Sequence, residues 1–194
     1  MDNCAKTEII IRPYREEDAQ GVRGICLETS TGPLREHPKM LFAAFCDYYI
    51  EQEPHNCFVA ATAQGQVAGY ILCAENGEHW AKVFREKYIE PAPVEAMRQF
   101  LEYTCATPLR YAGEYPAHLH IDLSPQFQRM GLGTRLMDAL TAHLRSKGVP
   151  GLMLSVASDN EKGFRFYKKY GFTIMAEQPN EIVMGLLLCG VNRE

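Results

Sequence analysis

Residues 125–134 read Pro-Gln-Phe-Gln-Arg-Met-Gly-Leu-Gly-Thr, and they join a strand-like segment to an amphipathic segment that predicts a helix. Gly131 and Gly133 leave little side-chain bulk at this junction, so backbone N–H groups can close around an anion. The positive end of the helix dipole points at the same place. Gln128 and Arg129 can add donors to phosphate oxygens. The stretch therefore predicts a phosphate-binding loop, although a tight strand–loop–helix turn without a ligand has the same glycine pattern.

Known phosphate-binding patterns narrow the choice of anion. The nucleoside triphosphate pattern Gly-x-x-x-x-Gly-Lys-Ser/Thr is absent. The dinucleotide pattern needs a third glycine, and Arg135 and Leu136 stand where it would fall. The pattern Gln/Arg-x-x-Gly-x-Gly/Ala does fit, as Gln128-x-x-Gly131-x-Gly133. It resembles the pyrophosphate-binding loop of GNAT superfamily N-acetyltransferases, which use acetyl-CoA.

Bulk properties exclude several classes of partner. The 194 residues suffice for one domain with a substantial core. The net charge of -4 and the pI near 5.9 indicate no nucleic-acid partner. No apolar run approaches the roughly 20 residues that span a bilayer, so we expect no membrane partner. Because residues 1–6, Met-Asp-Asn-Cys-Ala-Lys, lack the apolar core of a signal peptide, the sequence predicts a cytoplasmic protein.

Cysteine and histidine usage predicts no metal site. The seven cysteines contain no Cys-x-x-Cys pair, and most lie in apolar segments, where a free thiol packs as a small hydrophobe. The six histidines make no ligand-spaced cluster; His118 and His120 are two apart on a predicted strand.

The pattern of apolar residues predicts an α/β (α+β) fold. We expect helices from residue 15, from Pro38, and at 78–88, 94–104, 131–147 and 161–169. We expect strands at 7–12, 57–62, 67–73, 117–123, 152–157, 172–176 and 182–188. The order strand, helix, strand over residues 117–157 implies a parallel pair with a right-handed crossover.

A second motif makes the resemblance specific. Asn160-x-x-Gly163-x-x-x-Tyr167-x-x-x-Gly171-Phe172 looks like the closing motif of GNAT enzymes. It follows the glycine loop by one helix and one strand, as in that family. The opening Ile-Arg-Pro-Tyr-Arg-Glu-Glu-Asp-Ala also resembles the way many GNAT proteins begin. The sequence is therefore identified as a member of the GNAT superfamily.

This resemblance implies a single GNAT domain over residues 1–194. Its mixed central sheet of about six or seven strands would be flanked by helices and splayed between strands 117–124 and 152–157. Residues 75–116 exceed what a short link between strands requires, so they are predicted to be a helical insertion. Two readings of the insertion stay open: a cover over the acceptor side, or a purely structural addition. The helix after Pro38 is likewise either core or a wall of the acceptor pocket.

The resemblance also assigns acetyl-CoA as co-substrate. Its pantetheine arm would lie between the splayed strands, where backbone groups are free to bond it. The Leu123 N–H would polarise the acetyl carbonyl, and Asn160 would bond the arm or the diphosphate. The residues assigned to the cofactor are Leu123, Ser124, Pro125, Gln128, Arg129, Met130, Gly131, Leu132, Gly133, Thr134 and Asn160.

Catalysis needs an acid and a base. The motif makes Tyr167 the candidate acid for the departing thiolate, against the alternative that it packs in the core. His120 and Asp122 are candidate bases because strand alternation puts them on one face with His118. If a helix covers that face, these are structural polar groups instead. If the face instead opens to the cleft, Glu114 and Tyr115 at its mouth come next as candidate bases.

The predicted function is acetyl-CoA-dependent N-acetylation of a primary amine, on a small molecule or peptide, by direct attack in a ternary complex. One alternative is a catalytically inactive acyl-CoA-binding regulatory module of the same fold. Another is an unrelated nucleotide- or phosphate-binding α/β protein. Residues 115–122 resemble, more loosely, bacterial GNAT proteins related to the acetyltransferase-like region of O-GlcNAcases. The strand at 182–188 permits a homodimer.

Overall fold

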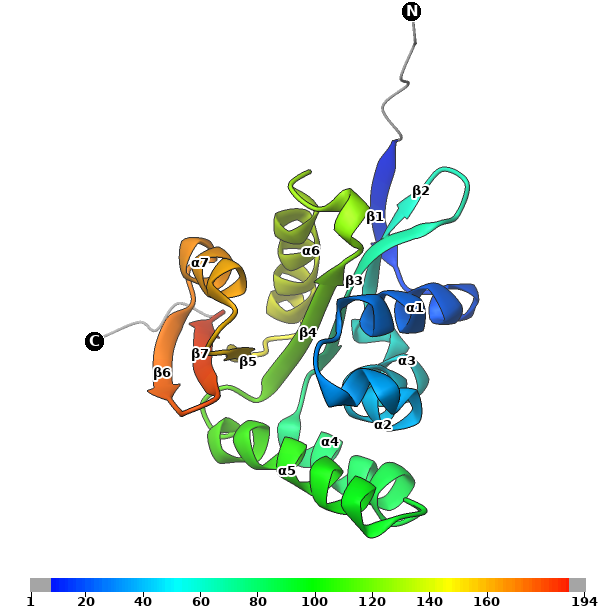
Figure 1. Cartoon of the computed structure of the whole chain (residues 1–194). Helices are drawn as coiled ribbons and strands as arrows, with labels where there is room; N and C mark the ends of the chain where they lie inside the picture. Colours follow the sequence, from blue (N-terminus) through cyan, green and yellow to red (C-terminus); the bar gives the residue numbers. More distant parts are fainter. Residues whose placement is uncertain (1–7, 189–194) are drawn as a thin grey trace, which may run out of the picture. The chain divides into compact units, whose positions relative to one another are not determined.

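The computed structural model describes residues 8–188 and gives the helices and strands shown in Figure 1. The strands are β1 (Ile9–Pro13), β2 (Phe58–Thr62), β3 (Val67–Ala74), β4 (Ala117–Leu123), β5 (Gly151–Ala157), β6 (Thr173–Glu177) and β7 (Glu181–Leu187). The helices are α1 (Ala19–Thr29), α2 (Pro38–Phe42), α3 (Tyr48–Gln52), α4 (Gly77–Phe84), α5 (Glu95–Tyr111), α6 (Leu132–Ser146) and α7 (Glu161–Tyr170). Residue 7, expected to begin the first strand, lies outside the described part.

The strands form a seven-stranded mixed sheet in the order β1-β2-β3-β4-β5-β7-β6. Four of its pairings are antiparallel: β1–β2, β2–β3, β5–β7 and β6–β7. The parallel β4–β5 ladder has just two Cα pairs, Ala117–Leu152 and His118–Met153, although each strand has seven residues. The predicted mixed sheet and the predicted splay of these two strands are therefore confirmed.

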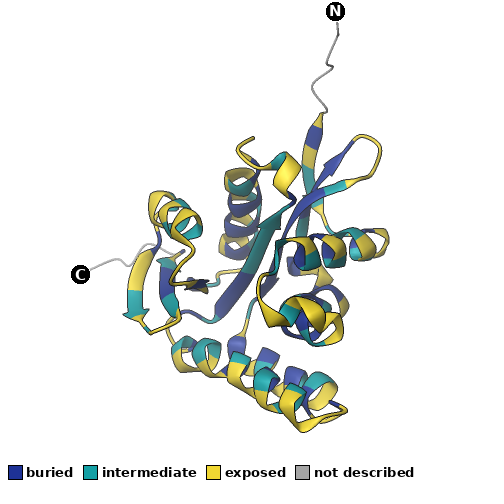
Figure 2. Ribbon diagram, in the orientation of Figure 1, coloured by how far each residue is buried: buried dark blue, intermediate teal, exposed yellow. Residues whose placement is uncertain are grey.

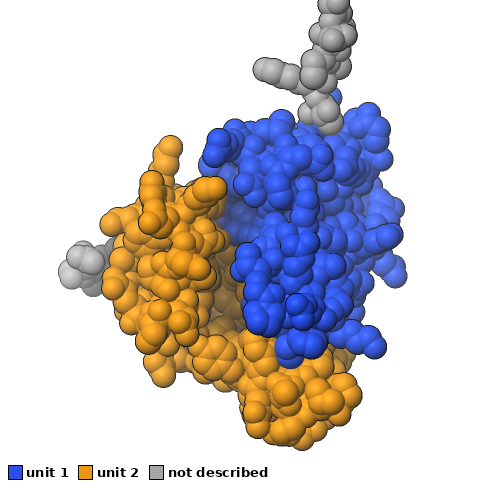
Figure 3. All heavy atoms as spheres, in the orientation of Figure 1, with its two compact units in different colours: residues 1–72, 121–140 blue, residues 73–120, 141–194 orange. Residues whose placement is uncertain are grey.

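The chain divides into two compact units, coloured separately in Figure 3. Unit 1 comprises Met1–Leu72 and Ile121–Leu140, and unit 2 comprises Cys73–His120 and Thr141–Glu194. Strands β3 and β4 and helix α6 each contribute residues to both units. The expectation of one domain stays a prediction.

The core of unit 1 buries the apolar faces of its helices, drawn in dark blue in Figure 2. On α1 the buried side chains are Val22, Ile25 and Cys26. The helical segment after Pro38 runs from α2 through Ala43–Asp47 into α3, and it contributes Tyr48 and Tyr49, both fully buried. Because the Tyr48 hydroxyl donates to buried Glu53 at 2.7 Å, that aromatic ring belongs to the core.

The predicted insertion supplies much of the core of unit 2. Trp80 of α4 is buried; its ring stacks on Phe84 at 5.0 Å and meets the edge of the His118 ring at 4.5 Å. Helix α5 extends to Tyr111, beyond its expected end at residue 104, although Pro108 lies inside it. An internal proline costs roughly 3 kcal/mol. After the proline, Tyr111 packs against the cluster of Tyr115, Met153 and Val183, which stabilises the last turn.

Strand β4 approaches β3 very closely at one glycine of unit 1. A Cβ at Gly69 would overlap Leu123 Cδ2 and would lie 2.9 Å from the Asp122 carbonyl oxygen. The Ser124 N–H donates to the Ala68 carbonyl at 3.0 Å, which fixes the end of β4 at the same place. Only glycine therefore lets β4 lie where it does.

We predict that Gly69→Ala lowers the free energy of unfolding by about 1–3 kcal/mol, because the added methyl must displace β4. Urea denaturation followed by circular dichroism measures the change. Gly24→Ala is the matched control: a Cβ there meets no atom within 4 Å, so that variant should be up to about 1 kcal/mol more stable. Equal stability of Gly69→Ala and the wild-type protein would contradict the close approach.

Candidate functional site

The loop between β4 and α6 alternates in backbone handedness. After a short turn at Pro125–Phe127, Arg129 has φ 63° and Gly131 has φ 76°, and α6 begins at Leu132. Such alternation turns successive N–H groups toward one concavity that binds anions. Within residues 8–188, Arg129 is the single non-glycine residue with positive φ. Because that conformation costs an L-residue about 1–2 kcal/mol, its guanidinium is held here at an energetic cost.

Contacts within unit 1 hold this loop in place. The Gln128 side chain donates to the Leu123 carbonyl at 3.3 Å, so it braces the loop against the end of β4. The Arg135 guanidinium donates to the Ile9 carbonyl at 2.9 Å and ties the first turn of α6 to β1. Leu132 is buried, which leaves only its backbone N–H to meet an anion. The first N–H groups of a helix have no partner inside that helix, so they are available to a ligand.

The other residues predicted to bind the cofactor differ in exposure. Met130 is exposed, as are Pro125 and Thr134. Gly133 is half-buried within the first turn of α6, where its N–H is one of the free helix donors. Ser124 is buried, with 4% of its surface exposed.

Asp122, on β4, has a carboxyl group with a raised pKa. Its carboxylate accepts a hydrogen bond of 2.8 Å from the hydroxyl of Tyr70, which is fully buried. Burial raises the pKa of Asp122 to about 6, and hydrogen bonds from Tyr70 and Thr29 offset only part of that rise. Burial first, and then the Asp122 charge, also raise the pKa of Tyr70, so the phenol remains the donor. Asp122 is therefore ionised at neutral pH but close to its titration.

The two histidines of β4, both in unit 2, have different surroundings. His118 is buried against Trp80, and burial lowers its pKa to about 3, with a further contribution from His120. His120 is half-buried, and burial lowers its pKa to about 4. Both imidazoles are therefore neutral and weakly basic near pH 7. His118 is a structural polar group, whereas His120 keeps partial access to solvent.

Tyr115 does not lie at an open mouth as expected. It is buried in a cluster with Met153 and Val183 in unit 2. A Cβ at Gly185 would lie 2.6 Å from its ring, so the ring is tightly enclosed. Glu114 beside it is exposed.

The closing motif has local structural roles in unit 2. Asn160 caps α7 by accepting a hydrogen bond from the Gly163 N–H at 2.9 Å. A Cβ at Gly163 would lie 2.8 Å from the Asn160 amide nitrogen, so the capping geometry favours glycine there. Gly171, with φ 118°, ends the helix. These contacts explain the motif's spacing without a ligand, and the cofactor role of Asn160 stays a prediction.

Tyr167 and its neighbour Tyr170 are placed differently on α7. The Tyr167 ring makes edge contacts with Phe166 at 5.3 Å and Phe172 at 5.8 Å, and the residue is half-buried. The Tyr170 hydroxyl lies 3.1 Å from the Thr141 hydroxyl, a hydrogen bond that fixes it to α6. Tyr167 therefore combines packing with partial exposure.

The predicted site residues divide between the units. Unit 1 brings Asp122 and Leu123 together with the loop at 124–134, whereas His120, Asn160 and Tyr167 lie in unit 2. The sequence reading missed Tyr70, although a hydroxyl in an otherwise apolar strand was a usable signal. No group of three or more potential metal ligands occurs within residues 8–188. None of the helices in that range could cross a membrane.

Comparisons with known proteins point to one family. The model described as "Acetyltransferase (GNAT) family" matches residues 25–172. A mycothiol acetyltransferase from Paenarthrobacter aurescens (strain TC1) is 28% identical over 120 residues, which are 62% of this chain and 28% of that protein. A second such relative, from Saccharomonospora viridis, is 28% identical over 116 residues, which are 59% of this chain and 29% of that protein. The chain thus spans less than a third of the length of these relatives.

Solved structures share the fold over nearly the whole chain. The crystal structure of SsHAT aligns with a TM-score of 0.83 and 28% identity, covering 94% of this chain and 99% of that one. A PaiA N-acetyltransferase from Thermoplasma acidophilum, in complex with coenzyme A, aligns with a TM-score of 0.60 and 16% identity, covering 93% and 99%. At that identity the second similarity shows the fold alone.

The raised pKa of Asp122 predicts a specific dependence of stability on pH. The folded chain keeps this proton up to pH about 6, whereas the unfolded chain loses it near the ordinary value of 3.8. The unfolded state therefore binds fewer protons in this window, and stability falls as pH rises through it. Because asparagine does not ionise, Asp122→Asn should gain about 1–2 kcal/mol relative to the wild-type protein between pH 4 and pH 7. Urea denaturation across that range measures the gain.

Tyr70→Phe provides the second arm of this experiment. Removing the phenol removes a hydrogen bond that lowers the Asp122 pKa. The pH range over which stability falls should therefore extend to higher pH. Parallel curves for the wild-type protein and Asp122→Asn would show that the carboxyl has its ordinary pKa.

Proposed function

This chain belongs to the GNAT acetyltransferase family, and from that premise we propose that it transfers the acetyl group of acetyl-CoA to a primary amine. The proposal is supported by the presence in unit 1 of both a loop with left-handed backbone at Arg129 and Gly131 and a carboxylate, Asp122, whose pKa burial raises to about 6. The first feature suits a cofactor diphosphate and the second suits removal of a proton from an amine.

Cofactor binding is assigned to the loop and to β4. The N–H groups of residues 129–134 would hold the diphosphate, and the Arg129 guanidinium would add a charge-assisted contact. Beyond His118, β4 has no ladder partner on β5, so its backbone groups are free to bond the pantetheine arm. The Leu123 N–H, near the end of β4, is proposed to polarise the acetyl carbonyl.

The chemistry requires one proton to be removed and another to be supplied. Asp122 takes the proton from the ammonium group, and the free amine then attacks the carbonyl carbon. We assign the base to Asp122 in preference to His120, because an imidazole with a pKa about 4 is the weaker base. As the C–S bond breaks, Tyr167 donates its phenolic proton to the CoA thiolate, and the second proton that the nitrogen loses on becoming an amide restores the phenol. Positioning of both substrates in one ternary complex supplies much of the rate.

Arg129→Gly tests the loop. Glycine adopts φ 63° without strain, so stability should not fall, while acetyl-CoA should bind about ten-fold more weakly because a charged contact is lost. Isothermal titration calorimetry measures the affinity. Arg35→Gly, at an exposed position of unit 1, is the control and should keep wild-type affinity. Unchanged binding by Arg129→Gly would remove the diphosphate assignment.

The transfer itself is tested by release of free CoA over a panel of polyamines, amino acids, aminoglycosides and N-terminal peptides. We expect turnover to fall as pH drops below about 6, because protonated Asp122 accepts no proton. In Asp122→Asn, kcat should be lower by a factor of about 10²–10⁴, and the fall in turnover below pH 6 should be absent. Tight acetyl-CoA binding without CoA release for any amine would favour the inactive regulatory module.

Tyr167→Phe separates acid catalysis from packing. It keeps the ring contacts with Phe166 and Phe172, so acetyl-CoA binding and thermal stability should persist while turnover falls. Tyr170→Phe is the matched control, since it removes a phenol bonded to Thr141 and should leave turnover intact. Wild-type turnover by Tyr167→Phe would show that Tyr167 only packs against its neighbours and is not the acid.

A further inference from the structure

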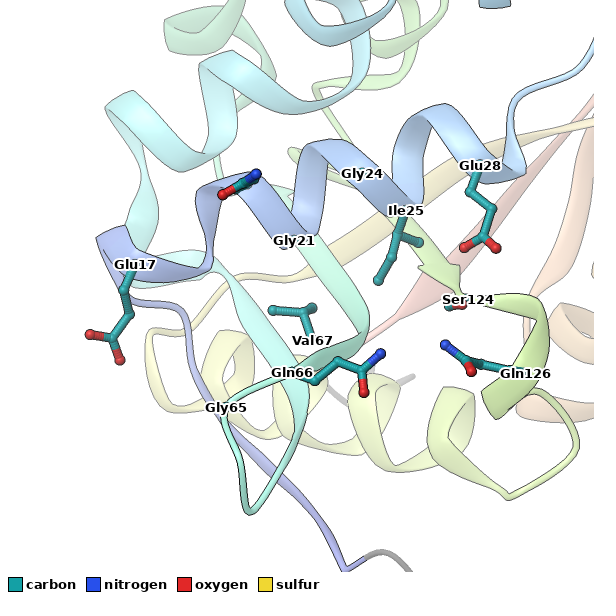
Figure 4. A pocket seen from close by; sticks show the side chains of 11 residues that line it. Glu17, Gly21, Gly24, Ile25, Glu28, Gly65, Gln66, Val67, Ser124 and Gln126 are labelled. Carbon is teal, nitrogen blue, oxygen red and sulfur yellow. The ribbon is translucent and has the colours of Figure 1, made fainter.

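Unit 1 contains a pocket of about 420 Å³ that shares only Ser124 with the residues assigned to the cofactor (Figure 4). It is lined by α1, by the turn leading into β3, and by Ser124 and Gln126 after β4. Its volume lies in the range typical of small-molecule sites.

The chemistry of the lining favours a cation. Glu17 and Glu28 line the pocket at opposite ends of the α1 segment, and no lysine or arginine is among its lining residues. They are eleven positions apart, which is roughly 16 Å along a helix axis. Glu17 has Arg15 at 3.4 Å, whereas Glu28 makes no ion pair within residues 8–188. Glu28 is therefore the carboxylate with its charge available.

Ser124 provides an independent sign of a ligand. It is 96% buried yet lines the pocket, and within the described part of the chain its hydroxyl has no hydrogen-bond partner. The hydroxyl oxygen is not among the fully enclosed polar atoms of residues 8–188 that lack a partner, so it is open to the pocket, where a bound molecule can supply the donor or acceptor.

The wall of α1 is kept open by a glycine that packing does not require. At Gly21 a Cβ would lie 2.7 Å from Val67, so packing explains that glycine. At Gly24, which lines the pocket, a Cβ would meet no atom within 4 Å. A glycine inside a helix costs roughly 1 kcal/mol relative to alanine. Gly24 thus leaves pocket volume free at the expense of helix stability.

We propose that this pocket binds the acceptor, and that the acceptor is a linear polyamine. One protonated amine lies against Glu28 and Ser124, the methylene chain crosses Ile25 and Val67, and a second amine approaches Glu17. Lysine-rich peptides carry similar charge, but a pocket of about 420 Å³ fits a small molecule better.

The Glu28 end of the pocket adjoins the proposed base. Thr29, next to Glu28, is one of the side chains that lower the pKa of Asp122, so the two side chains lie near each other. Ser124 lies two residues after Asp122 on the chain. An amine bound at this end is therefore close to the group that takes its proton. The inference rests on the proposed function at this point, because it uses Asp122 as the base.

Calorimetry without acetyl-CoA tests the pocket separately from turnover. Spermidine should bind the full chain, and butylamine, with a single charge, should bind at least ten-fold more weakly. Glu28→Gln and Gly24→Leu should each weaken spermidine binding at least ten-fold, the first by removing charge and the second by filling the pocket. Gly24→Leu should fold, since the position is open and leucine favours helix.

Matched controls are Glu36→Gln and Gly113→Leu. Both positions are exposed outside the pocket, and a Cβ at Gly113 meets no atom within 4 Å. Both controls should keep wild-type affinity. Equal spermidine affinity in the pocket variants and the controls, or stronger binding of a lysine tripeptide, overturns the inference.

Addition of acetyl-CoA then separates the two proposals. N-acetylspermidine formed by the wild-type protein, with KM raised in Glu28→Gln, supports both. Release of CoA with other amines but not with spermidine overturns the polyamine acceptor and leaves the acetyltransferase proposal standing. Spermidine binding lost in the pocket variants, with no CoA released for any amine, overturns the proposed function and with it the acceptor role of the pocket.

Discussion

The close approach of β4 to β3 at Gly69 determines where the chemistry of unit 1 lies. The absence of a side chain at Gly69 lets Leu123 pack against the glycine, and the Ser124–Ala68 hydrogen bond fixes the strand end. After Ser124 the chain enters the loop at 125–131. Asp122, directly before Leu123, accepts the hydrogen bond from Tyr70. A shift of β4 would therefore move the acid, the buried serine and the loop together.

The glycine loop and the closing motif differ in how strongly each indicates a bound cofactor. The loop contains a cost that local structure does not require, because Arg129 has a left-handed backbone that glycine would adopt more easily. In contrast, Asn160, Gly163 and Gly171 begin and end α7 through ordinary caps. The left-handed backbone at Arg129 costs energy and is not explained by packing or capping, so it indicates a ligand more strongly than the caps of α7 do. The loop is therefore the better-supported part of the cofactor site.

Much of the fold could be predicted from sequence because apolar periodicity and glycine or proline punctuation are local. The seven strands and the sheet's parallel pair follow from them. The end of α5 could not, since Pro108 normally stops a helix, whereas here the helix continues to Tyr111, which packs against residues distant in sequence. The acid–base assignment also needed structure. Strand alternation groups His118 with Asp122, but Trp80 encloses the first and Tyr70 bonds the second, and both contacts join segments distant in sequence.

Asp122 and Glu28 are both carboxylates, and their different environments give them different proposed roles. Asp122 is desolvated, and its raised pKa of about 6 lets it exchange a proton near neutral pH. Glu28 is exposed, lines the pocket and makes no ion pair within residues 8–188, so it can attract a cation. A polyamine needs both functions, because it arrives protonated and its reacting nitrogen must lose a proton before it can attack, while its other nitrogens keep their charge. In the proposed site, Glu28 of α1 binds a charged amine and Asp122 of β4 removes the proton from the reacting one.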